Sequence, residues 1–111
     1  MTHAMKLEGA SYEMVDQGKK IIELRLYDDK RRLVEIGDTI EFQSALKAEI
    51  KTQVRVTALL RYQTFDELIA DFAPHYFGHN DAAKVLASVR RFYSEADDRR
   101  NGILGIKFVK L

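Results

Sequence analysis

Three charged side chains that lie within six positions could do chemistry. Lys20, Glu23 and Arg25 occur in the stretch GKKIIELR, which covers residues 18–25. A lysine ammonium can hold a phosphate, and it can act as a base when it is desolvated. An arginine guanidinium offers planar paired donors that suit a phosphate or the edge of a base. Glu23 could hold both cations in place or accept from the donors of a nucleobase.

The same spacing also fits a solvated strand face. Residues 21–27, IIELRLY, alternate in the manner of a strand, with Ile22, Leu24 and Leu26 on one face. The other face carries Ile21, Glu23, Arg25 and Tyr27. Exposed ion pairs of this kind contribute only ~0–1 kcal/mol. From spacing alone the solvated face is the favoured interpretation, although Tyr27 would offer a ring on which a base could stack.

Length and composition bound the class of protein. The 111 residues suit one domain over residues 1–111, and 46% hydrophobic with 32% charged residues is typical of a globular chain. The net charge of +1 argues against non-specific coating of nucleic acid but leaves a local basic patch open. With no cysteine there is no disulfide, thiolate zinc site or cysteine nucleophile. No apolar run reaches ~18 residues and MTHAMKLEGA lacks signal-peptide features, so we expect no membrane span and a cytoplasmic location.

The elements that must position these charges are short. Strands are expected at 5–7, 21–27, 39–43, 50–63 and 103–111, and helices at 10–18, 64–72 and 81–92. The patterns predict one shared face for Val54, Val56, Ala58, Leu60 and Tyr62, and a capping box from Thr64 to Glu67. Residues 28–32 are expected to form a charged loop or a short turn, 75–80 an irregular segment and 94–102 a polar loop. This mixture indicates an α+β fold with a small curled, barrel-like sheet and two or three helices at its ends.

The remaining polar and aromatic candidates are weaker. His75 and His79 are four apart, but Gly78 and the neighbouring Pro and Asn favour a loop, and a third ligand is missing, so no metal is expected. Tyr93 is either a rim aromatic or a stacking platform for a base. The run of charges at 97–100 indicates a solvated loop or a lid.

The pattern G-x-K-x-x-E-x-R is met by Gly18, Lys20, Glu23 and Arg25. It resembles the signature of the ASCH domain, a member of the PUA-like superfamily, and in particular of its small single-domain bacterial members. Three further blocks resemble the family in the expected order, at 26–42, 62–69 and 92–108. The resemblance implies a PUA-like small barrel of about five or six strands, with flanking helices and the signature residues at a cleft.

Relatives in this family are linked to RNA, so the resemblance implies a cleft that binds RNA or a nucleotide and needs no cofactor. The residues expected to contact the ligand are Gly18, Lys20, Glu23, Arg25, Tyr27 and Tyr93. The alternative is a hydrolase, either a ribonuclease or an amidohydrolase, with Lys20 as base and Glu23 as acid or orienting group. In a third, bland alternative the motif is only structural within an interaction domain.

One branch of the family deacetylates acetylated cytidine with a lysine, a threonine and a glutamate. Lys20 matches the lysine, but Glu23 occupies the threonine position, and a carboxylate cannot replace a hydroxyl in acyl transfer. The glutamate of that branch should fall near Gly78, yet no glutamate lies between Glu67 and Glu95. We therefore expect acetylcytidine hydrolysis to be absent or very slow.

Overall fold

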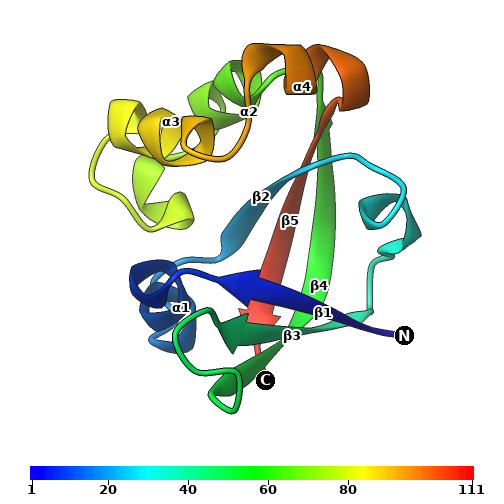
Figure 1. Ribbon diagram of the computed structural model, residues 1–111, viewed down its shortest axis with the longest axis vertical. Helices are drawn as coiled ribbons and strands as arrows, with labels where there is room; N and C mark the ends of the chain where they lie inside the picture. The colour runs from blue at the N-terminus through cyan, green and yellow to red at the C-terminus, as the bar shows by residue number, and fades with distance from the viewer.

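The computed structural model describes residues 1–111 and contains one five-stranded sheet that curls into a half barrel (Figure 1). The strands lie in the order β1-β3-β4-β5-β2, so that β1 and β2 form the two edges. Strands β1 and β3 are parallel, and all other pairs are antiparallel. The bounds are β1 Thr2–Leu7, β2 Ile22–Leu26, β3 Thr39–Ser44, β4 Lys51–Tyr62 and β5 Ile103–Lys110.

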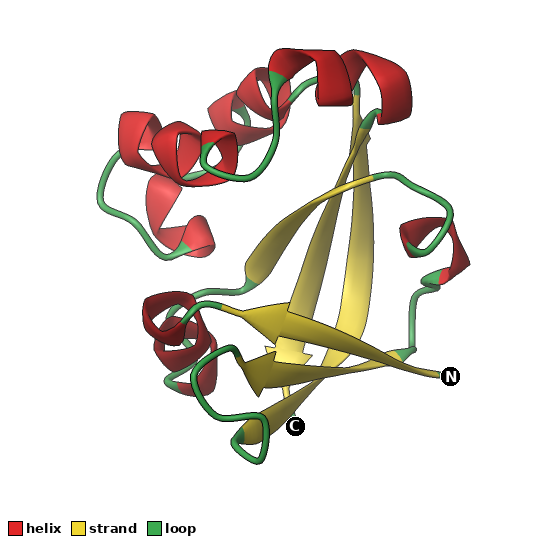
Figure 2. Cartoon of the chain, viewed as in Figure 1, coloured by secondary structure: helices red, strands yellow, loops and turns green.

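The helices are divided between two places (Figure 2). Helices α2 (Phe65–Ala70), α3 (Ala82–Arg90) and α4 (Glu95–Asn101) form a layer at one end of the sheet, while α1 (Gly9–Asp16) lies apart, beside the ends of β1 and β3. Two short 3-10 helices, η1 (Arg31–Leu33) and η2 (Pro74–Phe77), complete the chain. The α+β class and the barrel-like sheet are confirmed, with one α-helix more than predicted. None of the helices has the length and apolar character needed to cross a membrane.

The core consists of two clusters that share the sheet. One fills the inside of the half barrel and includes Phe42, Val56, Ile106 and Phe108. The other lies between the sheet and the helix layer and includes Ile22, Leu24, Phe65 and Leu68. The predicted alternation of β2 is confirmed, because Ile22 and Leu24 are buried against the helices, with Leu26 packed beside them. The side chains of the charged residues of β2 therefore project from the opposite face of the strand.

Strand β4 departs from its predicted pattern. Its register with β5 shifts between Val56 and Ala58, so that one extra residue is inserted. Val56 packs in the barrel cluster and Leu59 packs against it, whereas Leu60 and Tyr62 pack against the helix-side cluster. The prediction of one shared face is wrong beyond Val56, because an inserted residue inverts every later side chain.

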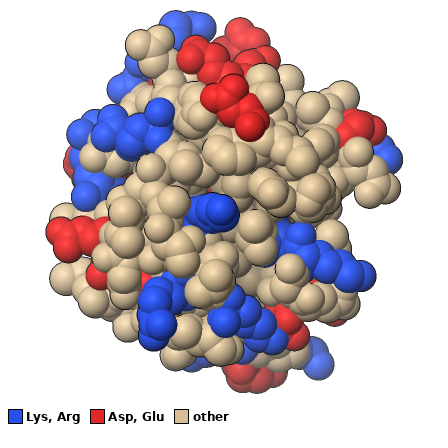
Figure 3. Space-filling model, turned by 180° about the vertical axis from the view of Figure 1, so that it is seen from behind, with Lys and Arg blue, Asp and Glu red and all other residues tan.

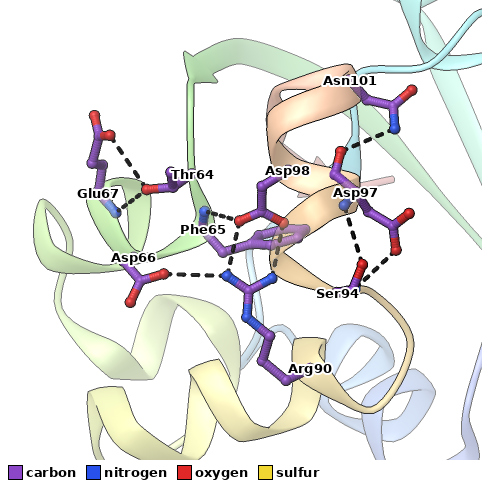
Figure 4. A network of polar contacts seen from close by, with 9 residues as sticks. All are labelled: Thr64, Phe65, Asp66, Glu67, Arg90, Ser94, Asp97, Asp98 and Asn101. Carbon is purple, nitrogen blue, oxygen red and sulfur yellow. Dashed lines mark hydrogen bonds and ion pairs between the residues drawn. The ribbon is translucent and has the colours of Figure 1, made fainter.

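The segment 94–102 is helical where a polar loop was predicted. Its start is a capping box: the Ser94 hydroxyl accepts from the Asp97 N–H at 3.2 Å, and the Asp97 carboxylate accepts from the Ser94 N–H at 2.8 Å. Asp98, expected in a solvated loop, is only 2% exposed. It accepts two hydrogen bonds of 2.9 Å from Arg90 and one of 3.1 Å from the Phe65 N–H (Figure 4). Asp98 therefore joins α2, α3 and α4.

Two other helix starts are close to prediction. The Thr64 hydroxyl accepts from the Glu67 N–H at 3.2 Å at the start of α2. The Glu67 carboxylate lies 3.3 Å from that hydroxyl instead of reaching the Thr64 backbone N–H, so the predicted box is only half formed. Asp81 caps α3 through the Lys84 N–H at 2.8 Å, close to the predicted start of this helix at residue 81.

The difference between the two aspartates of α4 predicts unequal effects. Asp98→Ala should lower the free energy of unfolding by ~3–5 kcal/mol, because it leaves Arg90 without its buried partner. Asp97→Ala removes only the return bond of a cap and should cost ~1 kcal/mol. Urea denaturation of both variants, with Asp29→Ala at an exposed position as control, measures this difference. Equal losses for the two variants would contradict the role given to Asp98.

Candidate functional site

A cavity of about 400 Å³ opens between the outer edge of β2, helix α1 and the helix layer. Its polar wall contains Lys20, Glu23 and Arg25. Its apolar wall is formed chiefly by Met14, Leu24, Phe77, Val85, Val89 and Tyr93. The cavity exists because β2 is the last strand of the sheet and no further strand pairs with its outer edge.

The chain reaches β2 through a turn that sets the position of Lys20. Gly18 has φ of 74°, a left-handed conformation that favours glycine and that ends α1. The Lys20 N–H then donates to the Met14 carbonyl at 3.0 Å. Gly78, with φ of 85°, passes so close that an added Cβ would lie 3.4 Å from Lys20 Cβ. These two glycines allow α1 and η2 to enclose the stem of Lys20.

The three signature charges form one connected cluster. Lys20 Nζ donates to Glu23 Oε1 at 2.8 Å, and Arg25 Nε donates to Glu23 Oε2 at 2.8 Å. Glu23 Oε1 also accepts from the Leu24 N–H at 3.2 Å. Lys20 is 9% exposed and Glu23 5%, so the solvated-face interpretation is wrong for this pair. Alternation within one strand could not indicate that α1 and η2 would cover the charged face.

Two further contacts tie the cluster to helix α1 and to β1, the opposite edge of the sheet. Lys20 Nζ donates to Ser11 Oγ on α1 at 2.7 Å. Arg25 Nη2 donates to the Lys6 carbonyl on β1 at 2.8 Å. Strands β1 and β2 are not paired with each other, so Arg25 spans the seam of the half barrel. Ser11 had no signal in the sequence, because its partner is nine residues away across a turn.

The electrostatics of the cluster keep Glu23 ionised. Burial would raise the pKa of Glu23, but the charges and hydrogen bonds of Lys20 and Arg25 outweigh burial and lower it to about 2. Burial tends to lower the pKa of Arg25, and the Glu23 charge reverses this and raises it. At neutral pH Glu23 is therefore a carboxylate with both oxygens occupied, and it is neither a proton donor nor an available base.

The two cations still have donors to offer. An ammonium has three N–H groups, and Lys20 uses two of them, on Ser11 and Glu23. The guanidinium of Arg25 donates through Nε and Nη2, and its Nη1 has no protein acceptor. Both residues line the cavity, so its polar wall presents donors to an anionic or acceptor-rich ligand.

The other predicted ligand residues divide into two groups. Tyr93 lines the cavity, and its ring stacks on Phe65 with centroids 5.7 Å apart. Tyr27 does not line the cavity, and its ring lies under the guanidinium groups of Arg61 and Arg32, 3.3 and 4.3 Å from the centroid. Gly18 also lies outside the cavity, where it shapes the turn before Lys20.

Several cavity residues were not among the ligand residues predicted from the sequence. Glu8 and Arg91 line the cavity and form a two-pronged ion pair, with distances of 2.8 and 3.1 Å, that links the start of α1 to the end of α3. They are 83 positions apart, so no local pattern could pair them. Both are exposed, so the pair is worth only ~0–1 kcal/mol and is easily exchanged for another partner.

The histidines do not form a metal site with their neighbours. His79 lines the cavity, and burial, followed by the charges of Lys20 and Lys84, lowers its pKa. His75 instead packs edge-on against Tyr76, with centroids 4.6 Å apart. No three His, Asp or Glu side chains gather closely enough to hold a metal ion.

A curled half barrel with helices beside it is the fold that the resemblance to the ASCH domain implies. The family model for the ASCH domain matches residues 5–110, and the chain belongs to this family. The match begins within β1, at Met5, and runs to the end of β5, at Lys110, so it includes every residue that lines the cavity.

Solved structures agree with this assignment. The crystal structure of hypothetical protein PH0355 superposes with a TM-score of 0.87 at 29% identity, over 100% of both chains. The NMR structure of protein PF0455 from Pyrococcus furiosus gives 0.77 at 31% identity, over 100% of this chain and 98% of that one. The crystal structure of ASCH from Zymomonas mobilis gives 0.61 at 12% identity, over 96% of this chain and 66% of that one, and shows the fold alone. No curated protein matches.

The low pKa of Glu23 predicts how stability varies with pH. Its folded pKa of about 2 lies below the ordinary value of 4.5, so its stabilisation is complete above about pH 4.5 and is lost as the pH falls toward 2. This contribution amounts to about 3 kcal/mol. The difference in free energy of unfolding between the wild type and Glu23→Gln should therefore shrink across that window.

Urea denaturation at a series of pH values measures this difference directly. Asp38, whose pKa is also lowered to about 2, titrates in both proteins and cancels from the comparison. A difference that stays constant from neutral pH down to pH 2 would rule out the stated coupling of Glu23 to its two cations.

Proposed function

We propose that the cavity binds a nucleotide or a short stretch of single-stranded RNA. The observation that carries this proposal is that the cavity has one polar wall and one apolar wall. The hydrogen-bond donors of Lys20 and Arg25 face an apolar surface that ends in Phe92 and Tyr93. A nucleotide has the matching character, because a flat base is joined to an anionic phosphate. Phe92 is 59% exposed, so its ring can accept a stacked base.

The edge of β2 adds a means of recognising a base. The Phe108 N–H donates to the Ile21 carbonyl, and the Tyr27 N–H donates to the Gly102 carbonyl, so the odd-numbered residues of β2 point their backbone groups at β5. The backbone groups of Ile22 and Leu24 therefore point away from β5, toward the cavity. Their carbonyl groups are acceptors that can meet the amino groups of a base.

The surface charge fits a compact ligand site. On the face opposite to that of Figure 1, Lys and Arg side chains lie in separate patches with acidic groups near several of them (Figure 3). The net charge of +1 also lacks the excess that coating of a duplex requires. Both facts favour recognition in the cavity over broad contact with a phosphate backbone.

A hydrolase acting on RNA or a modified nucleoside is the second candidate. The observation that favours it is the Ser11 hydroxyl, 2.7 Å from Lys20 Nζ inside the cavity. A hydroxyl beside a lysine is a possible nucleophile when the lysine accepts its proton. Here Lys20 donates to both Ser11 and Glu23, which is the reverse of that role. The geometry of the cluster supports binding better than it supports hydrolysis.

The binding proposal predicts a specific pattern of affinity. A fluorescein-labelled, mixed-sequence short RNA should bind at low salt, and its logarithmic salt slope should lie between about −1 and −2, since few cations converge. Lys20→Gln and Arg25→Gln should weaken binding at least about tenfold, because each charge-assisted contact contributes ~1.5–3 kcal/mol. Lys47→Gln, at an exposed position outside the cavity, should bind as the wild type does.

Fluorescence anisotropy measures these affinities, and circular dichroism confirms that each variant is folded. The four nucleoside 5′-monophosphates, used as competitors, test whether one nucleotide fills the cavity. Absence of binding by both the RNA and the monophosphates at low salt would remove the proposal.

Because the cluster supports binding better than hydrolysis, we expect no efficient turnover of RNA or nucleosides by this protein. Purified protein incubated with labelled RNA and with a panel of nucleosides that includes acetylated cytidine should leave both unchanged, because Glu23 is held ionised with both oxygens occupied and Lys20 donates to Ser11 instead of accepting its proton. Liquid chromatography of the products makes the measurement. Efficient turnover that is lost in Lys20→Ala and Glu23→Ala would favour the hydrolase instead.

A further inference from the structure

A second depression lies on the other side of the seam from the cavity. It is lined by Ala4, Met5, Lys6, Arg25, Lys30, Arg31 and Gln43. Four of these seven residues are cations and none is acidic, although the chain as a whole is nearly neutral. We call this depression the basic depression. Its composition indicates an affinity for an anion with several oxygen atoms.

The cations of the basic depression are incompletely paired. Arg31 Nε is buried and has no hydrogen-bond partner. It is the one buried side-chain nitrogen or oxygen atom of the protein that lacks such a partner. The other end of that guanidinium donates to Asp28 at 3.1 Å. Lys6 and Lys30 are exposed and form no ion pair, and Arg25 keeps Nη1 without an acceptor. An oxyanion in the basic depression would therefore meet cations whose hydrogen bonds and charge the protein does not fully satisfy.

The basic depression and the cavity meet at the seam. Lys6 and Arg25 line both of them, and Arg25 bridges β2 to the Lys6 carbonyl at 2.8 Å between the two. A ligand can therefore occupy both sides only if it crosses over Arg25. A nucleotide chain with a base at one end and a phosphate further along could place the base in the cavity and the phosphate in the basic depression.

We propose that the basic depression is a phosphate subsite for a single-stranded polynucleotide whose base occupies the cavity. This proposal rests on the proposed function, and it identifies the ligand as a phosphodiester chain instead of a lone nucleotide. Lys30 and Arg31 hold a backbone phosphate beyond the one next to Arg25. Lys30 thereby makes the protein prefer a polynucleotide chain over a single nucleotide.

The test compares ligands that reach the basic depression with ligands that do not. Lys30→Gln should weaken binding of the labelled short RNA about threefold to tenfold and lower the magnitude of its logarithmic salt slope by about 0.7. The same variant should leave affinity for a nucleoside monophosphate unchanged, since that ligand fills the cavity alone. Lys47→Gln is the matched control, because it removes an exposed lysine outside both sites.

A second measurement follows the Arg31 Nε–H group directly. In nitrogen-15 spectra of the wild type, titration with inorganic phosphate should shift the Arg31 Nε–H resonance, and Lys30→Gln should weaken that shift. Nucleoside triphosphates form a further arm, because a long phosphate tail could reach the basic depression without a second nucleotide. If Lys30→Gln weakens the binding of nucleoside triphosphates but not of RNA, the assignment of the ligand as a polynucleotide is wrong.

The two proposals fail in different ways. If RNA and monophosphates bind and Lys30→Gln behaves as Lys47→Gln does in every assay, the phosphate subsite is wrong and the cavity stands. If neither RNA nor monophosphate binds the wild type, the cavity proposal is wrong, and the subsite falls with it even if phosphate shifts Arg31. An equal loss of monophosphate and RNA binding in Lys30→Gln would also overturn the subsite, because it would place Lys30 at the base pocket.

Discussion

The structure depends on the burial of the Glu23 carboxylate between Lys20 and Arg25. A half barrel has two unpaired edges, and unpaired edges expose backbone groups that invite association with other chains. Here side chains close the seam in place of a backbone ladder. Arg25 reaches from β2 to the Lys6 carbonyl on β1, and Lys20 reaches Ser11 on α1. Glu23 orients both cations, so one carboxylate fixes β1, β2 and α1 relative to one another.

A seam closed by side chains differs from one closed by a strand in what it leaves accessible. A paired strand would have consumed the outward backbone groups of β2 and filled the space beside it. The side chains occupy only the region around Arg25 and leave the cavity on one side and the basic depression on the other. The helix layer, held together by Asp98 with Arg90, supplies the roof of the cavity through Val85 and Val89. Stability and access thus come from the same incomplete barrel.

Local signals in the sequence were sufficient for local structure. Gly18 ends α1, β2 alternates as expected, and Asp81 starts α3 because each depends on residues a few positions away. The inserted residue in β4 was missed because it depends on the register of β5, nearly fifty positions further on. The buried role of Asp98 was missed because a run of charges is indistinguishable from a solvated loop until Arg90 is brought near it.

The candidate site shows the same division. Spacing placed Glu23 and Arg25 on one face of a strand, with Lys20 just before that strand, but only the resemblance to a family indicated a cleft, since burial comes from α1 and η2 folding over these residues. Ser11, Glu8 and Arg91 enter the site through tertiary contacts that no short pattern encodes. Tyr27 shares the strand face yet lies outside the cavity, because its ring is engaged by Arg61 and Arg32.

The charge balance of the cluster supports the proposal that the site binds an anionic ligand. Two cations around one carboxylate leave one unit of positive charge in a partly buried place. Desolvation makes that uncompensated charge unfavourable until an anion arrives. The other carboxylate that lines the cavity, Glu8, does not cancel it, because Glu8 is already paired with Arg91. Because Glu23 is held ionised and fully occupied, it cannot relieve the excess by titrating near neutral pH. A ligand that brings its own negative charge would neutralise the site, and the phosphate of the proposed nucleotide has that charge.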